Sequence, residues 1–123
     1  MGRRGRVREG YLPVSAKPES KLVRACLDYL RLVGVAAWRN QSGMVFAEHQ
    51  GKRRAIRMGA KGGADIIGCL PPNGRTLAVE CKVPPNKLTP EQDAFLAAIR
   101  RAGGLAIVAE SIDDVMEAIN DRR

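Results

Sequence analysis

The chain has 123 residues, with 21 Lys and Arg against 13 Asp and Glu, a net charge of +8 and a pI near 10.0. This length suits one domain with a single core and excludes two. The positive charge favours a protein that binds a phosphate backbone, although ribosomal and membrane-surface proteins share it. No apolar run approaches the ~18 residues of a membrane span, and no signal-peptide segment follows the Arg-rich N-terminus. We therefore expect a cytoplasmic protein without a membrane segment.

The cysteines indicate the redox compartment and argue against zinc. Cys26, Cys69 and Cys81 have no Cys-x-x-Cys spacing and lie in apolar contexts. We therefore expect buried, reduced thiols in a reducing, cytosolic compartment, and no zinc site.

Residues 1–14 contain arginines that alternate with glycine, and they show no apolar periodicity. This composition predicts a flexible basic arm. On charge pattern alone, the arm is either a solvated tail or a DNA-contacting segment. We expect one folded domain to follow it over residues 15–123.

A helix is predicted from Pro18, with Gly34 as its C-terminal cap. Its apolar stripe is formed by Leu22, Val23, Cys26, Leu27 and Leu30. Glu19 lies in the first turn and on the same inward stripe. A Glu in a first turn is commonly only favourable for the helix dipole, but a position that faces the core shifts the weight toward a functional role. Glu48 is the competing acid.

Residues 35–38 are predicted to form the first strand, and residues 44–47 a possible second. A basic tract follows, which consists of Lys52, Arg53, Arg54, Arg57 and Lys61. The glycines of residues 59–63 are suited to bringing the backbone close to a phosphate. The tract is either a solvated basic loop or a DNA-contacting segment. We favour contact with the substrate backbone because the tract leads directly to Asp65.

Two apolar segments, residues 65–70 and 76–83, flank a Pro-Pro-Asn-Gly turn signal and predict a β-hairpin. Asp65 opens the first segment, and Glu80 and Lys82 lie near the end of the second. Since side chains alternate between the two faces of a strand, Glu80 and Lys82 share one face, and apolar residues form the other.

The register of this hairpin decides which charges meet. Proline cannot donate to a ladder, so the simplest loop holds residues 71–74 and sets Asp65 opposite Glu80. A two-residue Asn73-Gly74 loop instead sets Asp65 opposite Lys82 and gives an ordinary cross-strand ion pair. We favour the first register, because charges at the end of an apolar, central strand are costly without a function.

Two like charges that face each other across strands are destabilising unless something positive lies between them. Magnesium takes oxygen ligands, often one or two carboxylates plus waters and a substrate phosphate. Asp65 and Glu80 are therefore candidate Mg²⁺ ligands. Lys82, one pleat from Glu80, is a candidate for binding the scissile phosphate or orienting the attacking water.

A capping box, Thr89-Pro90-Glu91-Gln92, predicts the start of the next helix, and Gly103-Gly104 its end. Capping alone is a sufficient reason for Gln92. Residues 105–109 predict a short buried strand, and residues 111–114 cap a final helix. The order helix, strands, helix, strand, helix predicts a single α/β domain with a mixed sheet flanked by helices.

At these residues the chain resembles a known family. An Asp at the start of one strand and Glu-x-Lys on the next form the core signature of the PD-(D/E)xK nuclease superfamily. The wider pattern covers roughly residues 18–110 and is similar to the VRR-NUC (virus-type replication-repair nuclease) branch. Its ordered motifs are Glu19, Trp38-Arg39-Asn40-Gln41-Ser42-Gly43, Gly59-Ala60-Lys61-Gly62-Gly63-Ala64-Asp65, Glu80-Cys81-Lys82 and Leu88-Thr89-Pro90-Glu91-Gln92. One departure is Ala64, where many relatives have proline.

The resemblance implies a restriction-endonuclease-like core and a metal-dependent endonuclease that hydrolyses DNA phosphodiesters. It implies Mg²⁺ as the cofactor, with Mn²⁺ as a candidate substitute. Similar stand-alone proteins tend to act on branched DNA, including four-way (Holliday) junctions, which implies a homodimer. The implied catalytic residues are Asp65, Glu80, Lys82, Gln92 and Glu19, of which the metal ligands are Asp65, Glu80 and Glu19. The predicted DNA-binding residues are Arg39, Arg53, Arg54, Arg57 and Lys61.

Two alternatives stay open at this point. The first is a non-catalytic nucleic-acid-binding module of the same fold, and the intact set of Asp65, Glu80 and Lys82 argues against it. The second is a nuclease that acts on flap or linear DNA.

Overall fold

The computed structural model describes residues 17–41 and 43–121. Its elements follow in the order α1 Pro18–Leu32, β1 Ala36–Arg39, β2 Gly43–His49, β3 Lys52–Met58, β4 Ile66–Leu70, β5 Arg75–Cys81, α2 Pro90–Arg101, β6 Leu105–Ala109 and α3 Ile112–Asp121. The predicted basic arm, residues 1–14, lies outside the described residues. Within the described ranges, no helix has the length and apolar character needed to cross a membrane.

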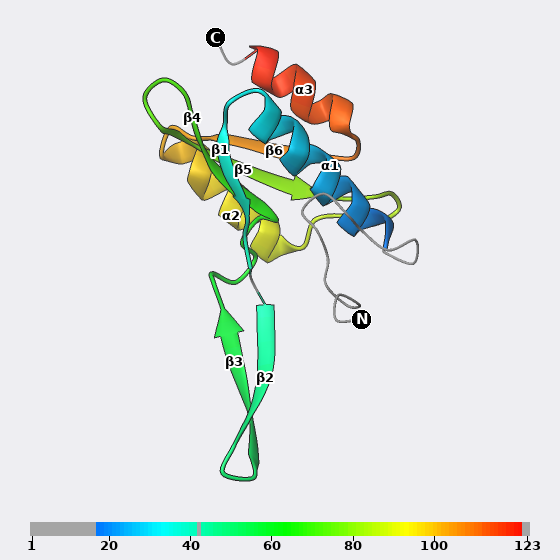
Figure 1. The fold of residues 1–123 in the computed structure, drawn as a ribbon, viewed down its shortest axis with the longest axis vertical. Coiled ribbons are helices and arrows are strands. Elements are labelled where there is room, and N and C mark those ends of the chain that lie inside the picture. The colour runs from blue at the N-terminus through cyan, green and yellow to red at the C-terminus, as the bar shows by residue number, and fades with distance from the viewer. Residues whose placement is uncertain (1–16, 42, 122–123) are drawn as a thin grey trace, which may run out of the picture.

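Four strands form a mixed sheet in the order β1-β4-β5-β6. Strands β1, β4 and β5 are antiparallel, and β6 runs parallel to β5. Helices α1 and α3 pack on one face of this sheet and α2 packs on the other (Figure 1). The predicted fold class, a single α/β domain with a mixed sheet flanked by helices, is therefore confirmed.

The central strand β5 is covered on both faces. Alternate residues from Leu77 to Cys81 are buried in the cluster formed with α1 and α3. Ala78 points the other way and is buried with Leu96 of α2. Because side chains alternate, Glu80 lies on the same face as Ala78. With only 3% of its surface exposed, Glu80 is a buried acid at the end of a buried strand.

The β4–β5 hairpin adopts the register with a four-residue loop. Leu70 pairs with Arg75, and the ladder continues to the pair Ile66–Val79. The next position along this register sets Asp65 opposite Glu80. The alternative register, with Asp65 opposite Lys82, is therefore excluded.

Strands β2 and β3 form a separate two-stranded sheet that projects away from the four-stranded sheet (Figure 1). Gln50 and Gly51 connect them with positive φ values of 53° and 75°, which is the backbone of a type I′ hairpin turn. The possible strand at residues 44–47 is thus part of β2. No strand is expected from the sequence at Lys52–Met58, because consecutive positive charges obscure the alternation of a strand.

The cysteines differ from expectation at one position. Cys26 and Cys81 are buried free thiols, as predicted. Cys69 is a free thiol but is exposed, so the prediction of burial is wrong there. It lies on the face of β4 that belongs to α2, opposite Ala36 of the outer strand β1, and α2 packs on β5 and β6 instead.

Candidate active site

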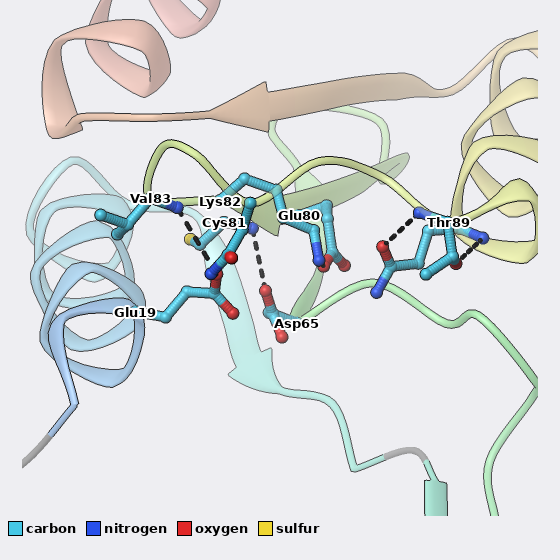
Figure 2. Close-up of polar contacts among 9 residues, drawn as sticks. Glu19, Asp65, Glu80, Cys81, Lys82, Val83 and Thr89 are labelled. Carbon is cyan, nitrogen blue, oxygen red and sulfur yellow. Dashed lines mark hydrogen bonds and ion pairs between the residues drawn. The ribbon is translucent and has the colours of Figure 1, made fainter.

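Three acidic residues from distant parts of the chain converge at one end of the sheet. Asp65 immediately precedes β4, Glu80 lies in β5, and Glu19 lies in the first turn of α1. Figure 2 shows their carboxylates directed toward one region, with Lys82 beside Glu80.

Asp65 is held in place by hydrogen bonds on both of its sides. Its Oδ2 accepts a hydrogen bond of 2.8 Å from the backbone N–H of Cys81 in β5. On the other side, the backbone N–H of Asn40 donates to the Asp65 carbonyl at 2.7 Å, and Asn40 Nδ2 donates to the Ala64 carbonyl at 3.0 Å. Asp65 is thus fixed between the ends of β1 and β5.

The loop before Asp65 packs against the start of α2. Gly62 has a φ of +75°, and a Cβ built there would lie 2.5 Å from the backbone of Glu91 in the first turn of α2. Only glycine allows this approach without a shift. This close approach fixes the position of the loop before Asp65 against the start of α2.

Glu80 is buried with one of its carboxylate oxygens unpaired within the residues that the structure describes, and its pKa is raised. Its Oε2 lies 3.5 Å from Lys82 Nζ, whereas Oε1 is buried and has no hydrogen-bond partner among the described residues. Desolvation above all, and then the charge of Asp65, raise the pKa of Glu80 to about 7, against the opposing effect of Lys82. Desolvation also raises the pKa of Asp65, with Glu19 adding to the effect.

Glu19 faces the site, as its position on the apolar stripe predicts. Its Oε2 accepts hydrogen bonds from the backbone N–H of Val83 at 3.4 Å and from Asn86 Nδ2 at 3.3 Å. Glu19 thereby ties the start of α1 to the loop after β5 (Figure 2). Glu48, the other acid considered for this role, is exposed on β2 and lies opposite Arg53 in the β2–β3 ladder.

Lys82 and the residue before it are both held by the sheet. The side chain of Lys82 is 12% exposed, and its backbone N–H donates to the Ala109 carbonyl at 2.9 Å. The hydrogen bond with Cys26, together with burial, raises the pKa of the Cys81 thiol, so Cys81 stays uncharged between Glu80 and Lys82. Lys82 is therefore the positive partner of the buried Glu80.

Gln92 forms the predicted capping box. Its backbone N–H donates to Thr89 Oγ1 at 3.1 Å, and its Oε1 accepts from the Thr89 backbone N–H at 3.0 Å (Figure 2). The amide oxygen is thus engaged in capping α2. A catalytic role for Gln92 stays a prediction.

The structure divides the predicted DNA-binding residues into two groups. Arg39 is exposed at the end of β1, where its charge partly opposes the rise in the pKa of Asp65 that desolvation causes. Lys61 forms an exposed ion pair of 3.6 Å with Glu91. Arg53 and Arg54 are exposed on β3, in the projecting hairpin. Arg57 also belongs to β3, but its side chain lies outside what the structure describes.

The donor set fits a divalent cation that binds to few protein ligands. Among the described residues, no three His, Cys, Asp or Glu side chains are close enough to form a ready-made metal cage. Mg²⁺ seldom uses such a cage, since it keeps several waters and often binds to one or two carboxylates. The unpartnered Oε1 of Glu80 and the raised pKa values of Glu80 and Asp65 are what a bound cation would relieve.

Two residues of this site have no role in the sequence-based expectations. Asn40 lies in the motif from Trp38 to Gly43. Its place at the end of a strand is the signal that could have predicted its contact with the segment before Asp65. Asn86 carries no such signal, because its contact with Glu19 joins residues 67 positions apart.

The described residues form a small α/β domain with an acid pair and a lysine at one end of its mixed sheet. The model of the VRR-NUC domain family matches residues 29–113, well over half of the chain, and the chain belongs to this family. The matched range includes Asp65, Glu80, Lys82 and Gln92 and begins after Glu19. Comparisons with curated proteins and with solved structures found no match.

Proposed function

We propose that this chain is a Mg²⁺-dependent endonuclease that hydrolyses phosphodiester bonds in DNA, with branched DNA such as four-way junctions as its substrate class. The observation that carries the proposal is the buried, unpartnered Oε1 of Glu80, next to the second carboxylate of Asp65. Such a pair is costly to the fold unless a cation neutralises it. Membership of a nuclease family supports the same chemistry.

Each residue of the site has a role in this proposal. Asp65 and Glu80 hold the ion, and Glu19 contributes its carboxylate from the side of α1. When bound, Mg²⁺ supplies activation of a water and neutralisation of charge at the phosphate. Lys82 binds the scissile phosphate or orients the attacking water, since its ammonium lies 3.5 Å from Glu80. The water oxygen bonds to phosphorus and gives up a proton to solvent, the bond between phosphorus and the leaving oxygen breaks, and the leaving oxygen takes up a proton from solvent.

DNA binding in this proposal depends on charge and not on base reading. In this proposal Arg39 and Lys61 contact phosphates next to the carboxylates, and Arg53 and Arg54, which are exposed on β3, contact the backbone along the hairpin. Arg57 stays a prediction from the sequence. Phosphate contacts release counterions, so the affinity should fall steeply with salt and differ little between sequences.

The decisive assay is cleavage of linear duplex, flap and four-way-junction DNA, each with Mg²⁺, with Mn²⁺ and with a chelator. Asp65→Asn and Glu80→Gln should abolish cleavage and leave DNA binding largely intact, because each removes a negative ligand with little change in volume. Glu117→Gln, the same change at an exposed acid of α3, is the matched control. Cleavage that survives both site variants would contradict the assignment.

Metal binding can be measured without any cleavage. Mg²⁺ should raise the unfolding temperature of the wild-type protein, because a ligand that binds only the folded state stabilises it. Glu80→Gln should lose most of this shift and Glu117→Gln should keep it. A wild-type protein that neither gains stability nor cuts any of the three substrates would point to the non-catalytic binding module.

Paired cuts across a four-way junction require two active sites in one complex. A 13.4 kDa chain with one site supplies only half of them, so we propose a homodimer with twofold symmetry. Light scattering of Glu80→Gln bound to a junction should show two chains. A strict monomer that makes only single, uncoupled nicks would contradict junction resolution and leave the nuclease chemistry in place.

A further inference from the structure

The sheet face that carries the acidic site continues onto a half-exposed aromatic residue. Trp38 of β1 pairs with Ile67 of β4, which in turn pairs with Ala78 of β5, so all three side chains lie on the face of α2. Ile67 and Ala78 belong to the cluster under α2. Trp38 lies one strand further out and is 47% exposed.

Trp38 is also a neighbour of Asp65 in the sheet. The backbone N–H of Asn40 donates to the Asp65 carbonyl, which continues the β1–β4 ladder and sets Asn40 across from Asp65. Trp38, two residues earlier, is the diagonal neighbour of Asp65 on the same face. Diagonal neighbours in an antiparallel pair are ~7–8 Å apart, within reach of an aromatic side chain. This separation is about two steps of the ~3.4 Å rise along a DNA strand.

We propose that the exposed face of Trp38 is a stacking platform for an unpaired base next to the scissile phosphate. This inference rests on the proposed function and narrows its substrate class. A base inside a duplex is already stacked on its neighbours, whereas a base in a flap, a single strand or a junction branch point is free to stack on an indole. Stacking is tolerant of sequence, since every base has a π-face. It therefore suits a protein that selects DNA by structure.

Charge and area favour DNA over a second protein chain on this face. Arg39, the next residue along β1, starts from the opposite face but is exposed at the end of the strand, and its charge acts on Asp65. The chain as a whole carries a net charge of +8. A stable dimer buries about 800 Å² on each partner, which is far more than one half-exposed indole beside Ala36 and Cys69 provides. Pairing along the edge of β1 is hindered as well, because Arg31 Nε donates to the outward-facing Ala37 carbonyl at 3.2 Å.

The chain offers a direct probe of this contact, because Trp38 is its single tryptophan. In a chelator, oligodeoxythymidylate should quench the tryptophan fluorescence of the wild-type protein to saturation. A blunt duplex of the same length should quench it far less. In parallel, fluorescence anisotropy of labelled DNA measures the affinities of the variants, and circular dichroism verifies that they are folded.

Trp38→Leu keeps an apolar contact with Ile67 but removes the ring, so its affinity for the single strand should fall about 5- to 100-fold. Trp38→Phe, the conservative variant, should restore part of the loss, and both variants should bind the duplex like the wild type. Leu32→Ala removes an apolar side chain that is 84% exposed at the end of α1 and should leave both affinities unchanged.

Two results would overturn the proposal. One is a wild-type protein that binds the single strand without any change in its tryptophan fluorescence, together with a Trp38→Leu variant that binds it with the same affinity. The other is fluorescence that shifts with protein concentration in the absence of DNA, which would show that a second copy covers Trp38. The wild-type protein could show quenching, and Trp38→Leu a loss of affinity, while no DNA is cleaved in Mg²⁺. This result would support the stacking platform and contradict the nuclease function, so the two failures are distinguishable.

Discussion

Glu80→Gln is expected to make the metal-free protein more stable near pH 8, although it removes a proposed metal ligand. Glu80 is buried, and desolvation followed by the charge of Asp65 raises its pKa from the ordinary 4.5 to about 7. Glutamine has nearly the same shape and carries no charge that must be desolvated. Its amide oxygen can still accept a hydrogen bond from Lys82.

The sign and size of the effect follow from proton linkage. The folded state holds the Glu80 proton more tightly than the unfolded chain does, so the wild-type free energy of unfolding falls as the pH rises between 4.5 and about 7. The stabilisation is complete below the unfolded pKa and is lost as the pH rises through the folded pKa. A shift of this size corresponds to on the order of 3 kcal/mol. Glu80→Gln should exceed the wild type by up to that amount at pH 8 and match it near pH 4.

Urea denaturation in a chelator, at several pH values between 4 and 8, measures this difference directly. Glu117→Gln, which changes an exposed acid, should follow the wild type throughout. Equal pH slopes for Glu80→Gln and the wild type, or a Glu80→Gln variant that is less stable at pH 8, would refute the reasoning.

Three further predictions follow from single contacts. Lys82→Ala should lower the single-turnover cleavage rate on pre-bound DNA much more than the DNA affinity, because its charge acts at the reacting phosphate or water; an unchanged rate would leave Lys82 with only its ion pair. Gln92→Glu can preserve the capping box, so lost cleavage at an unchanged unfolding temperature would indicate a catalytic role, and unchanged cleavage would leave capping alone. Gly62→Ala should destabilise the fold by about 1–3 kcal/mol more than Gly74→Ala in urea denaturation, because both glycines have positive φ but only Gly62 meets the backbone of Glu91; equal losses would show that this approach is not tight.

The parts of the fold that follow from local rules can be predicted from the sequence. Two consecutive prolines disfavour the two-residue loop, because proline cannot donate to a ladder, and so favour the pairing of Asp65 with Glu80 that the hairpin adopts. The box that begins at Thr89 predicts the start of α2, because its hydrogen bonds span only three residues. Spacing on α1 likewise predicts that Glu19 faces inward.

The parts that depend on distant contacts cannot be predicted in this way. The exposure of Cys69 depends on how far α2 extends across the sheet, and no local pattern records that extent. The contact of Asn86 with Glu19 requires the packing of α1 against the end of β5. Strand β3 is not predicted from the sequence, because it begins with three consecutive basic residues, Lys52, Arg53 and Arg54, and so lacks the alternation of apolar and polar residues that indicates a strand.

The projecting hairpin has a consequence for how this domain can change over evolutionary time. Strands β2 and β3 pair with each other in a sheet of their own, and within the described part of the chain no ladder joins them to the four-stranded sheet. Substitutions, insertions or deletions near Gln50 and Gly51 therefore leave the strands that carry Asp65 and Glu80 unaltered. The reach and charge of the hairpin can diverge between relatives at little cost in stability, while the geometry of the acidic site is inherited unchanged.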